Sequence, residues 1–225
     1  GTTFTRCEHD GGVGGQFTGH PLSDWSKMET YEVPDPVGEG CFEEAEEQLR
    51  ESGDAYVLGT VGNTLFERLH FLRGFNNVLT DFHLQPEKVN FLLDSILDFD
   101  IGLLDRWIEL GVDGIFFLDD FGMQDRLIVS PATWNEFFKP RYAELIGRAH
   151  EAGLDTFLHT CGDVVELVPR LIEIGLDVLQ SVQPHAMDLA ELGEAFRGKI
   201  CFMGGIDTQR TLPAGTPKDV AEEIR

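Results

Sequence analysis

A histidine and a cysteine two residues apart, at the polar end of a short apolar segment, are the residues in this sequence best suited to chemistry. Residues 156–162 begin with Thr-Phe-Leu and continue with His159, Thr160, Cys161 and a glycine. The segment is too short for a helix, so it predicts a strand with a polar carboxyl end. Side chains two apart on a strand point the same way, so His159 and Cys161 should face one side together. They would supply half of a tetrahedral zinc site; the alternative is a hydrogen-bonded histidine beside an inert buried cysteine.

The composition indicates a globular α/β protein, and its charge restricts the partners. The chain has 225 residues, 42% of them hydrophobic, which is enough for one sizeable core. Its 17 basic and 40 acidic residues give a formal net charge of -23, so we expect no nucleic acid and no anionic membrane surface as partner. Four scattered cysteines, with no signal peptide and no run near the ~18 apolar residues of a membrane span, favour a cytoplasmic location.

Strand and helix patterns alternate along most of the chain. The predicted strands are residues 55–62, 114–120, 156–162, 178–182 and 199–205. Helical patterns are predicted at residues 41–52, 65–74, 86–110, 130–151, 164–174 and 189–196, and again from residue 217. Strands that are apolar on both faces and each followed by a helix indicate a parallel sheet. Polar strand ends favour an α/β fold of the (β/α)8 TIM-barrel type, present as about five of its units, with a doubly wound sheet as the alternative.

The two parts of the chain are predicted to differ in regularity. Glycines at 11–15 lack the preceding strand and following helix of a phosphate-binding loop, so they indicate a hairpin or an irregular surface segment. We therefore divide the chain into residues 1–54, an irregular segment with a short helix packing on the barrel, and residues 55–225, the partial barrel. The sequence begins without Met and ends within a helical pattern, so we expect it to be part of a longer protein.

Several short motifs occur in the order and spacing of a known family. They are residues 75–81 (Phe-Asn-Asn-Val-Leu-Thr-Asp), 117–121 (Phe-Leu-Asp-Asp-Phe), 138–142 (Phe-Lys-Pro-Arg-Tyr), 159–162 (His-Thr-Cys-Gly) and 204–207 (Gly-Gly-Ile-Asp). From about His20 onward the chain resembles the uroporphyrinogen decarboxylase family, which includes cobalamin-dependent methyltransferases. The resemblance implies a (β/α)8 barrel, in agreement with the strand count.

The two branches of that family imply different chemistry. Decarboxylases of this type use no metal and hold a tetrapyrrole with an arginine pair near the amino terminus, a segment that we expect to lie outside this sequence. The methyltransferases bind zinc through a His-x-Cys, which His159 and Cys161 match, and through a later cysteine that would fall beyond Arg225. We favour a zinc-dependent methyltransferase that uses a methylcobamide, with a corrinoid protein as partner and a small molecule as acceptor. The alternatives are uroporphyrinogen decarboxylase, a lyase of porphyrin biosynthesis, and a non-catalytic ligand-binding barrel.

Other polar residues at strand ends are further candidates for the site. Asp119 and Asp120 end one strand, where alternation lets only one face the barrel mouth, and the resemblance favours Asp119. Asp207 is a third catalytic candidate, and we expect it to share a cavity with Asp119, His159 and Cys161. Candidate substrate-binding residues are Asn63, Gln180, Gln183 and His185, although a surface-loop role is the simpler interpretation of His185. Cys201 lies too deep for a ligand and is predicted to be a core residue, as are Trp134, Phe137 and Phe138 on their helix.

Overall fold

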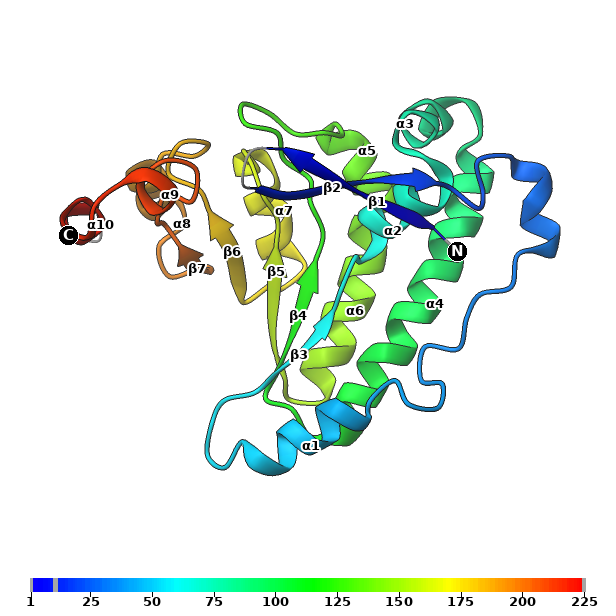
Figure 1. Ribbon diagram of the computed structural model, residues 1–225, viewed down its shortest axis with the longest axis horizontal. Helices are drawn as coiled ribbons and strands as arrows, with labels where there is room; N and C mark the ends of the chain where they lie inside the picture. Colours follow the sequence, from blue (N-terminus) through cyan, green and yellow to red (C-terminus); the bar gives the residue numbers. More distant parts are fainter. Residues whose placement is uncertain (1, 10–11, 224–225) are drawn as a thin grey trace.

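Five parallel strands form the main sheet of the computed structural model, which describes residues 2–9 and 12–223. The strands are β3 (Leu58–Val61), β4 (Gly114–Leu118), β5 (Asp155–His159), β6 (Val178–Val182) and β7 (Cys201–Gly204). They lie side by side in chain order, and every neighbouring pair is parallel (Figure 1). This confirms the predicted sheet. A doubly wound sheet would reverse its strand order at a switch point, whereas this order progresses as in a barrel.

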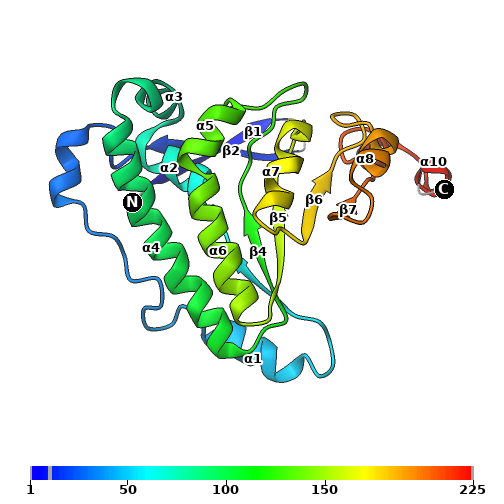
Figure 2. The ribbon, with the colours of Figure 1, turned by 180° about the vertical axis from the view of Figure 1, so that it is seen from behind.

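The longer helices cover one face of the sheet (Figures 1 and 2). The α-helices after β3 are α2 (Leu65–Arg73), α3 (Phe75–Leu84), α4 (Pro86–Leu110), α5 (Pro131–Phe137), α6 (Lys139–Glu151), α7 (Val168–Glu173), α8 (Leu189–Phe196), α9 (Thr211–Ala214) and α10 (Pro217–Glu223). A short 3-10 helix, η2 (Val165–Leu167), directly precedes α7. The apolar face of α4, formed by Val89, Leu92, Leu93, Ile96 and Leu97, is buried. Trp134, Phe137 and Phe138 are buried as well, as predicted. Among the described residues, no helix has the length and apolarity needed to cross a membrane.

The strands alternate between the helix layer and the opposite face of the sheet. On β4, Ile115 and Phe117 are fully buried, whereas Phe116 between them is only partly buried. On β5, Leu158 is buried and His159 is half-buried, and the register pairs His159 with Leu118. Residues that pair across parallel strands share a face, so His159 lies on the face of the sheet away from the helices. In a closed barrel this is the face that lines the interior.

The structure corrects one helical prediction and one core prediction, and it contains one helix that the sequence analysis did not predict. The helix predicted at 130–151 is broken at Phe138, because Pro140 lacks an N–H and disfavours a helical residue before it. Helix α2 ends just before Gly74, whose φ is 93°, and the next helix, α3, was not predicted. Cys201 is exposed rather than buried, because β7 is the edge strand of the described sheet.

The amino-terminal segment consists of a hairpin, the 3-10 helix η1 (Trp25–Thr30) and the helix α1 (Glu43–Glu51). Strands β1 (Thr3–His9) and β2 (Gly12–Gly19) are antiparallel, which agrees with the hairpin, one of the two alternatives that the sequence left open; residues 10–11 between them lie outside the described residues. The hairpin lies at the end of the sheet toward which the strands β3–β7 point, and α1 lies at the opposite end (Figure 1). Buried Arg73 joins this segment to the helices: it donates to Asp81 Oδ2 at 2.7 Å and to Leu22 O at 3.0 Å, and stacks on Trp25.

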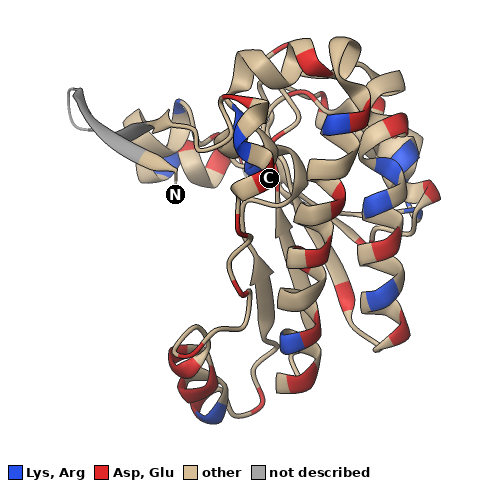
Figure 3. Ribbon diagram, turned by 90° about the vertical axis from the view of Figure 1, so that its right-hand side faces the viewer, with Lys and Arg blue, Asp and Glu red and all other residues tan. Residues whose placement is uncertain are grey.

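The acidic residues are spread over many helices rather than gathered at one place (Figure 3). Helix α1 alone carries three glutamates in its first turn, Glu43, Glu44 and Glu46. Basic residues are interspersed among the acidic ones, and Arg148 of α6, for example, pairs with Asp105 of α4. The net charge is therefore a property of the whole surface, and it does not by itself indicate where a ligand binds.

Candidate metal centre

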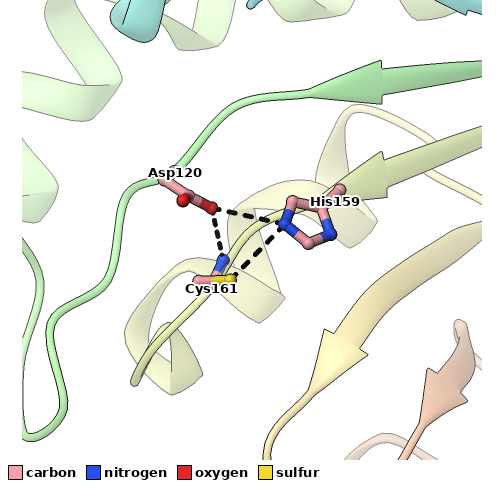
Figure 4. Close-up of side chains that lie close together, drawn as sticks. All are labelled: Asp120, His159 and Cys161. Atoms are coloured by element: carbon pink, nitrogen blue, oxygen red, sulfur yellow. Dashed lines mark hydrogen bonds and ion pairs between the residues drawn. The ribbon is translucent and has the colours of Figure 1, made fainter. Parts of the chain in front are cut away.

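Asp120, His159 and Cys161 converge at the carboxyl ends of β4 and β5 (Figure 4). The Nε2 atom of His159 lies 3.4 Å from the Sγ of Cys161 and 3.6 Å from the Oδ1 of Asp120. One donor atom from each residue lies within 4.8 Å of the other two. All three side chains are partly exposed, so the cluster is open to a ligand. The predicted common orientation of His159 and Cys161 is confirmed.

Strand geometry explains this convergence. Alternation sends Thr160 toward the helix layer, where it is buried and its Oγ1 accepts a hydrogen bond from Phe121 N at 2.9 Å. Thr160 N donates to Gln180 O at 2.8 Å, so the parallel ladder continues past the last residue of β5. The N–H of Cys161 donates to Asp120 Oδ1 at 2.7 Å, which fixes the carboxylate beside the thiol.

Two glycines let the loops after β4 and β5 cross. Gly162 has a φ of 82°, and a Cβ there would lie 2.4 Å from the carbonyl carbon of Gly122. A Cβ on Gly122 would in turn lie 2.4 Å from Cys161 O. Both positions therefore require glycine, because any side chain would push Asp120 and Cys161 apart. The glycine that ends the His-Thr-Cys-Gly motif thus has a specific geometric role.

Two glutamines hold the histidine and the thiol. Gln180 Oε1 makes a short hydrogen bond with His159 Nδ1, which places the proton on Nδ1 and leaves the Nε2 lone pair facing Asp120 and Cys161. Gln183 Oε1 accepts from Gly162 N at 2.9 Å, and its Nε2 lies 3.8 Å from Cys161 Sγ. Both residues were predicted to bind substrate, but in the structure their side chains contact the candidate ligands. Such hydrogen bonds orient metal-binding histidines.

We expect Gln180→Leu to weaken metal affinity by about 10–100-fold, the usual effect of removing the group that orients a ligating histidine. Gln180→Glu retains an acceptor for the Nδ1 proton and should preserve most of the affinity. The measurement is competition for zinc with a chromophoric chelator. Equal affinities for the leucine variant and the wild type would show that Gln180 does not orient His159.

Asp119 does not face this cluster, so its predicted orientation is wrong. Its Oδ2 accepts from Phe66 N and Tyr142 OH, both at 2.8 Å, and its Oδ1 accepts from Glu67 N at 2.8 Å. The side chain is fully buried, and burial raises its pKa to about 7. The buried residues of β4 face the helix layer and Asp119 continues their alternation, so its neighbour Asp120 faces the other way.

The remaining candidates lie outside the cluster. Asp207 and His185 pair with each other, with His185 Nε2 2.9 Å from Asp207 Oδ2, so the predicted convergence of Asp207 with the cysteine is not observed. The reason is local: the carboxylate of Asp207 binds the amides that start α9. Asn63 is exposed and has a φ of 49°, which places it in the turn before α2.

Two acidic groups, one in the cluster and one beside it, have pKa values raised above their usual ranges. Burial raises the pKa of the Cys161 thiol to about 11, and nearby Asp120 and Glu67 contribute to the shift. Burial, with Asp119 and Asp120, raises the pKa of Glu67 to about 8. The sequence analysis missed Glu67, although its place in the first turn after a strand end was a usable signal. A site in which carboxylates oppose a thiolate favours a bound cation, which would stabilise all of them.

The donor set fits zinc. Nitrogen, sulfur and carboxylate oxygen are its common protein ligands, and tetrahedral zinc with bonds of about 2.0–2.3 Å places donor atoms roughly 3.4–3.6 Å apart. The separations of 3.4 Å and 3.6 Å from His159 Nε2 match that spacing. Asp120 is thus a candidate third ligand within this chain.

The fold and the cluster together define an α/β protein with a partial barrel sheet and with side chains that could hold a metal ion at the carboxyl ends of its strands. The sequence model of the uroporphyrinogen decarboxylase (URO-D) family matches residues 7–225, and the chain belongs to this family. A curated relative, the methylated-thiol–coenzyme M methyltransferase of Methanosarcina mazei, is 23% identical over 154 residues, covering 68% of this chain and 40% of the relative. A solved methyltransferase from Methanosarcina mazei superimposes with a TM-score of 0.74 at 21% identity, covering 96% of this chain and 64% of that structure. The chain therefore spans less than two thirds of either protein.

Proposed function

We propose that the full-length protein is a zinc-dependent methyltransferase that moves a methyl group between a corrinoid and a small acceptor. The observation that carries this proposal is the cluster of Asp120, His159 and Cys161 at the sheet's carboxyl edge. The name of the curated relative includes a methylated thiol, the methylated form of a thiol substrate, which supports a small thiol as the molecule that exchanges a methyl group with the corrinoid. A corrinoid protein as partner and a cytoplasmic location belong to the same proposal.

Within this chain, His159, Cys161 and Asp120 would hold the metal, and Gln180 and Gln183 would orient the first two. Zinc would supply Lewis acidity, which lowers the pKa of a bound thiol so that it is a nucleophile at neutral pH. The corrinoid would carry the methyl group. The raised pKa of Cys161 implies that metal binding displaces a proton, so affinity should increase with pH through the neutral range.

Decarboxylation of a tetrapyrrole is less well supported, although the family is named for it. Its substrate carries several carboxylates, and the cluster presents the carboxylate of Asp120 as further negative charge. A metal-free reaction also gives no role to a thiol placed 3.4 Å from an imidazole.

The experiment uses the full-length protein, purified without chelator. We expect about one zinc per chain by elemental analysis and demethylation of methylcobalamin when a small thiol is added, followed by the change in corrinoid absorbance. Consumption of uroporphyrinogen by a zinc-free protein would establish the decarboxylase instead. If the full-length protein contained no zinc and showed neither of these activities, the remaining alternative would be a non-catalytic barrel.

A further inference from the structure

A second polar group, His185 with Asp207, lies in the loops that follow β6 and β7. His185 Nε2 is 2.9 Å from Asp207 Oδ2, and the imidazole is 41% exposed whereas the carboxylate is only 4% exposed. When a buried carboxylate holds one ring nitrogen of an exposed imidazole, the other ring nitrogen is available to a ligand. The cluster described above uses neither residue.

Hydrogen bonds determine which nitrogen of His185 is available. Asp207 Oδ1 accepts from the backbone N–H groups of Gln209 at 2.8 Å and Arg210 at 3.1 Å, and Oδ2 accepts from Thr211 N at 3.1 Å. Burial raises the pKa of Asp207, but these bonds and His185 lower it below its usual value. The carboxylate therefore accepts the hydrogen bond from Nε2 of His185, and in a neutral imidazole this leaves Nδ1 as an acceptor.

The pair is held at the same edge of the sheet as the candidate metal centre. Gln124, in the loop after β4, donates from Nε2 to His185 O at 2.9 Å, and Gln209 Nε2 donates to Gln124 Oε1 at 3.0 Å. The loop that carries His185 begins with Gln183, which contacts Cys161. Neighbouring strands are about 4.8 Å apart, so the ends of β6 and β7 lie within roughly 10 Å of the end of β5.

The surroundings of Asp207 add negative charge. Glu223 Oε1 accepts from Asp207 N at 2.6 Å, and its Oε2 is buried without a hydrogen-bond partner in the described part of the chain. Two arginines lie in the neighbouring loops. Arg126 lies 3.7 Å from the carboxylate of Asp125, and the side chain of Arg210 is exposed. An acceptor nitrogen beside two carboxylates attracts a group that donates hydrogen bonds and disfavours an anion.

We propose that His185, positioned by Asp207, binds the end of the methyl acceptor away from its reacting atom, and that this end carries an amino or hydroxyl group rather than a sulfonate or carboxylate. The inference rests on the proposed function for the reacting atom. It names the acceptor class: a small thiol with a neutral or cationic hydrogen-bond donor. His185 Nδ1 accepts the hydrogen bond from that donor.

The test compares three thiols that differ only in the distal group: 2-aminoethanethiol, 2-mercaptoethanol and 2-mercaptoethanesulfonate. Binding to the full-length zinc protein is measured by calorimetry, and methyl transfer from methylcobalamin gives KM and kcat. We expect the amino and hydroxyl thiols to bind about tenfold more tightly than the sulfonate, the usual effect of one well-placed hydrogen bond. His185→Ala should remove that preference by raising KM for the first two, with kcat nearly unchanged.

His83→Ala, which replaces an exposed histidine on α3, is the control and should leave the preference intact. Three results would overturn the proposal. The first is that the sulfonate thiol binds more tightly than the others and loses this advantage on Arg210→Ala. The others are that His185→Ala weakens binding of all three thiols equally, or that the amino and hydroxyl thiols do not bind. If calorimetry shows the preference for the amino and hydroxyl thiols but no methyl transfer is detected, the proposed function is refuted and the binding role of His185 is supported. Methyl transfer without a preference would refute the binding role of His185 alone.

Discussion

Replacing Cys161 with serine is expected to remove bound zinc from the full-length protein and to reduce methyl transfer at least about 100-fold. A serine hydroxyl keeps its proton at neutral pH and is a poor ligand for zinc, whereas a thiol gives up its proton to the metal. Serine is also close to cysteine in size, and Cys161 is only partly buried, so the fold should remain. Zinc is measured by elemental analysis, and folding by the far-ultraviolet circular dichroism of both proteins.

Cys201→Ser is the matched control, because Cys201 is exposed on the edge strand β7. This variant should retain the zinc and the activity of the wild type. If Cys161→Ser also kept about one zinc per chain, Cys161 would not be a ligand and the proposed function would lose its main support.

Asp119→Ala is expected to lower the free energy of unfolding by about 3–5 kcal/mol, since two helix amides and one hydroxyl would lose a buried acceptor. The amides belong to Phe66 and Glu67 at the start of α2, and the hydroxyl belongs to Tyr142. Tyr142→Phe removes only one of these hydrogen bonds, so it should cost about 1–2 kcal/mol. Denaturant unfolding of the three proteins measures the differences.

The adjacent residue provides the control. Asp120→Ala should change the free energy of unfolding by less than about 1 kcal/mol, because its side chain is partly exposed, while zinc affinity falls. The opposite result, a stable Asp119→Ala protein that no longer binds zinc, would place Asp119 in the site and refute the orientation described here.

The sheet could be predicted because each strand is a short apolar run that ends in polar residues or glycine. Period-two alternation likewise predicted that His159 and Cys161 share a face. Alternation could not choose between Asp119 and Asp120, because β4 is apolar on both faces and its sequence does not distinguish them. The register, which pairs Leu118 with His159, resolves the choice by placing Asp120 beside Cys161.

Contacts between segments that are distant in the sequence could not be predicted from the sequence alone. Gln180 and Gln183 were recognised as strand-end residues, but their bonds to His159 and Gly162 depend on how β5 and β6 pair. Asp207 was placed in the wrong cluster because the amides that hold it are grouped only when α9 forms. The break in the helix predicted at 130–151 had a local signal in Pro140, and it was overlooked.

The most direct test of the central claim is an anomalous difference map at the zinc absorption edge, from crystals of the full-length protein grown with zinc. We predict one strong peak at bonding distance, about 2.0–2.3 Å, from His159 Nε2, Cys161 Sγ and Asp120 Oδ1. A peak elsewhere, or none while these three side chains keep the positions seen in Figure 4, would contradict the assignment of this cluster as the metal centre.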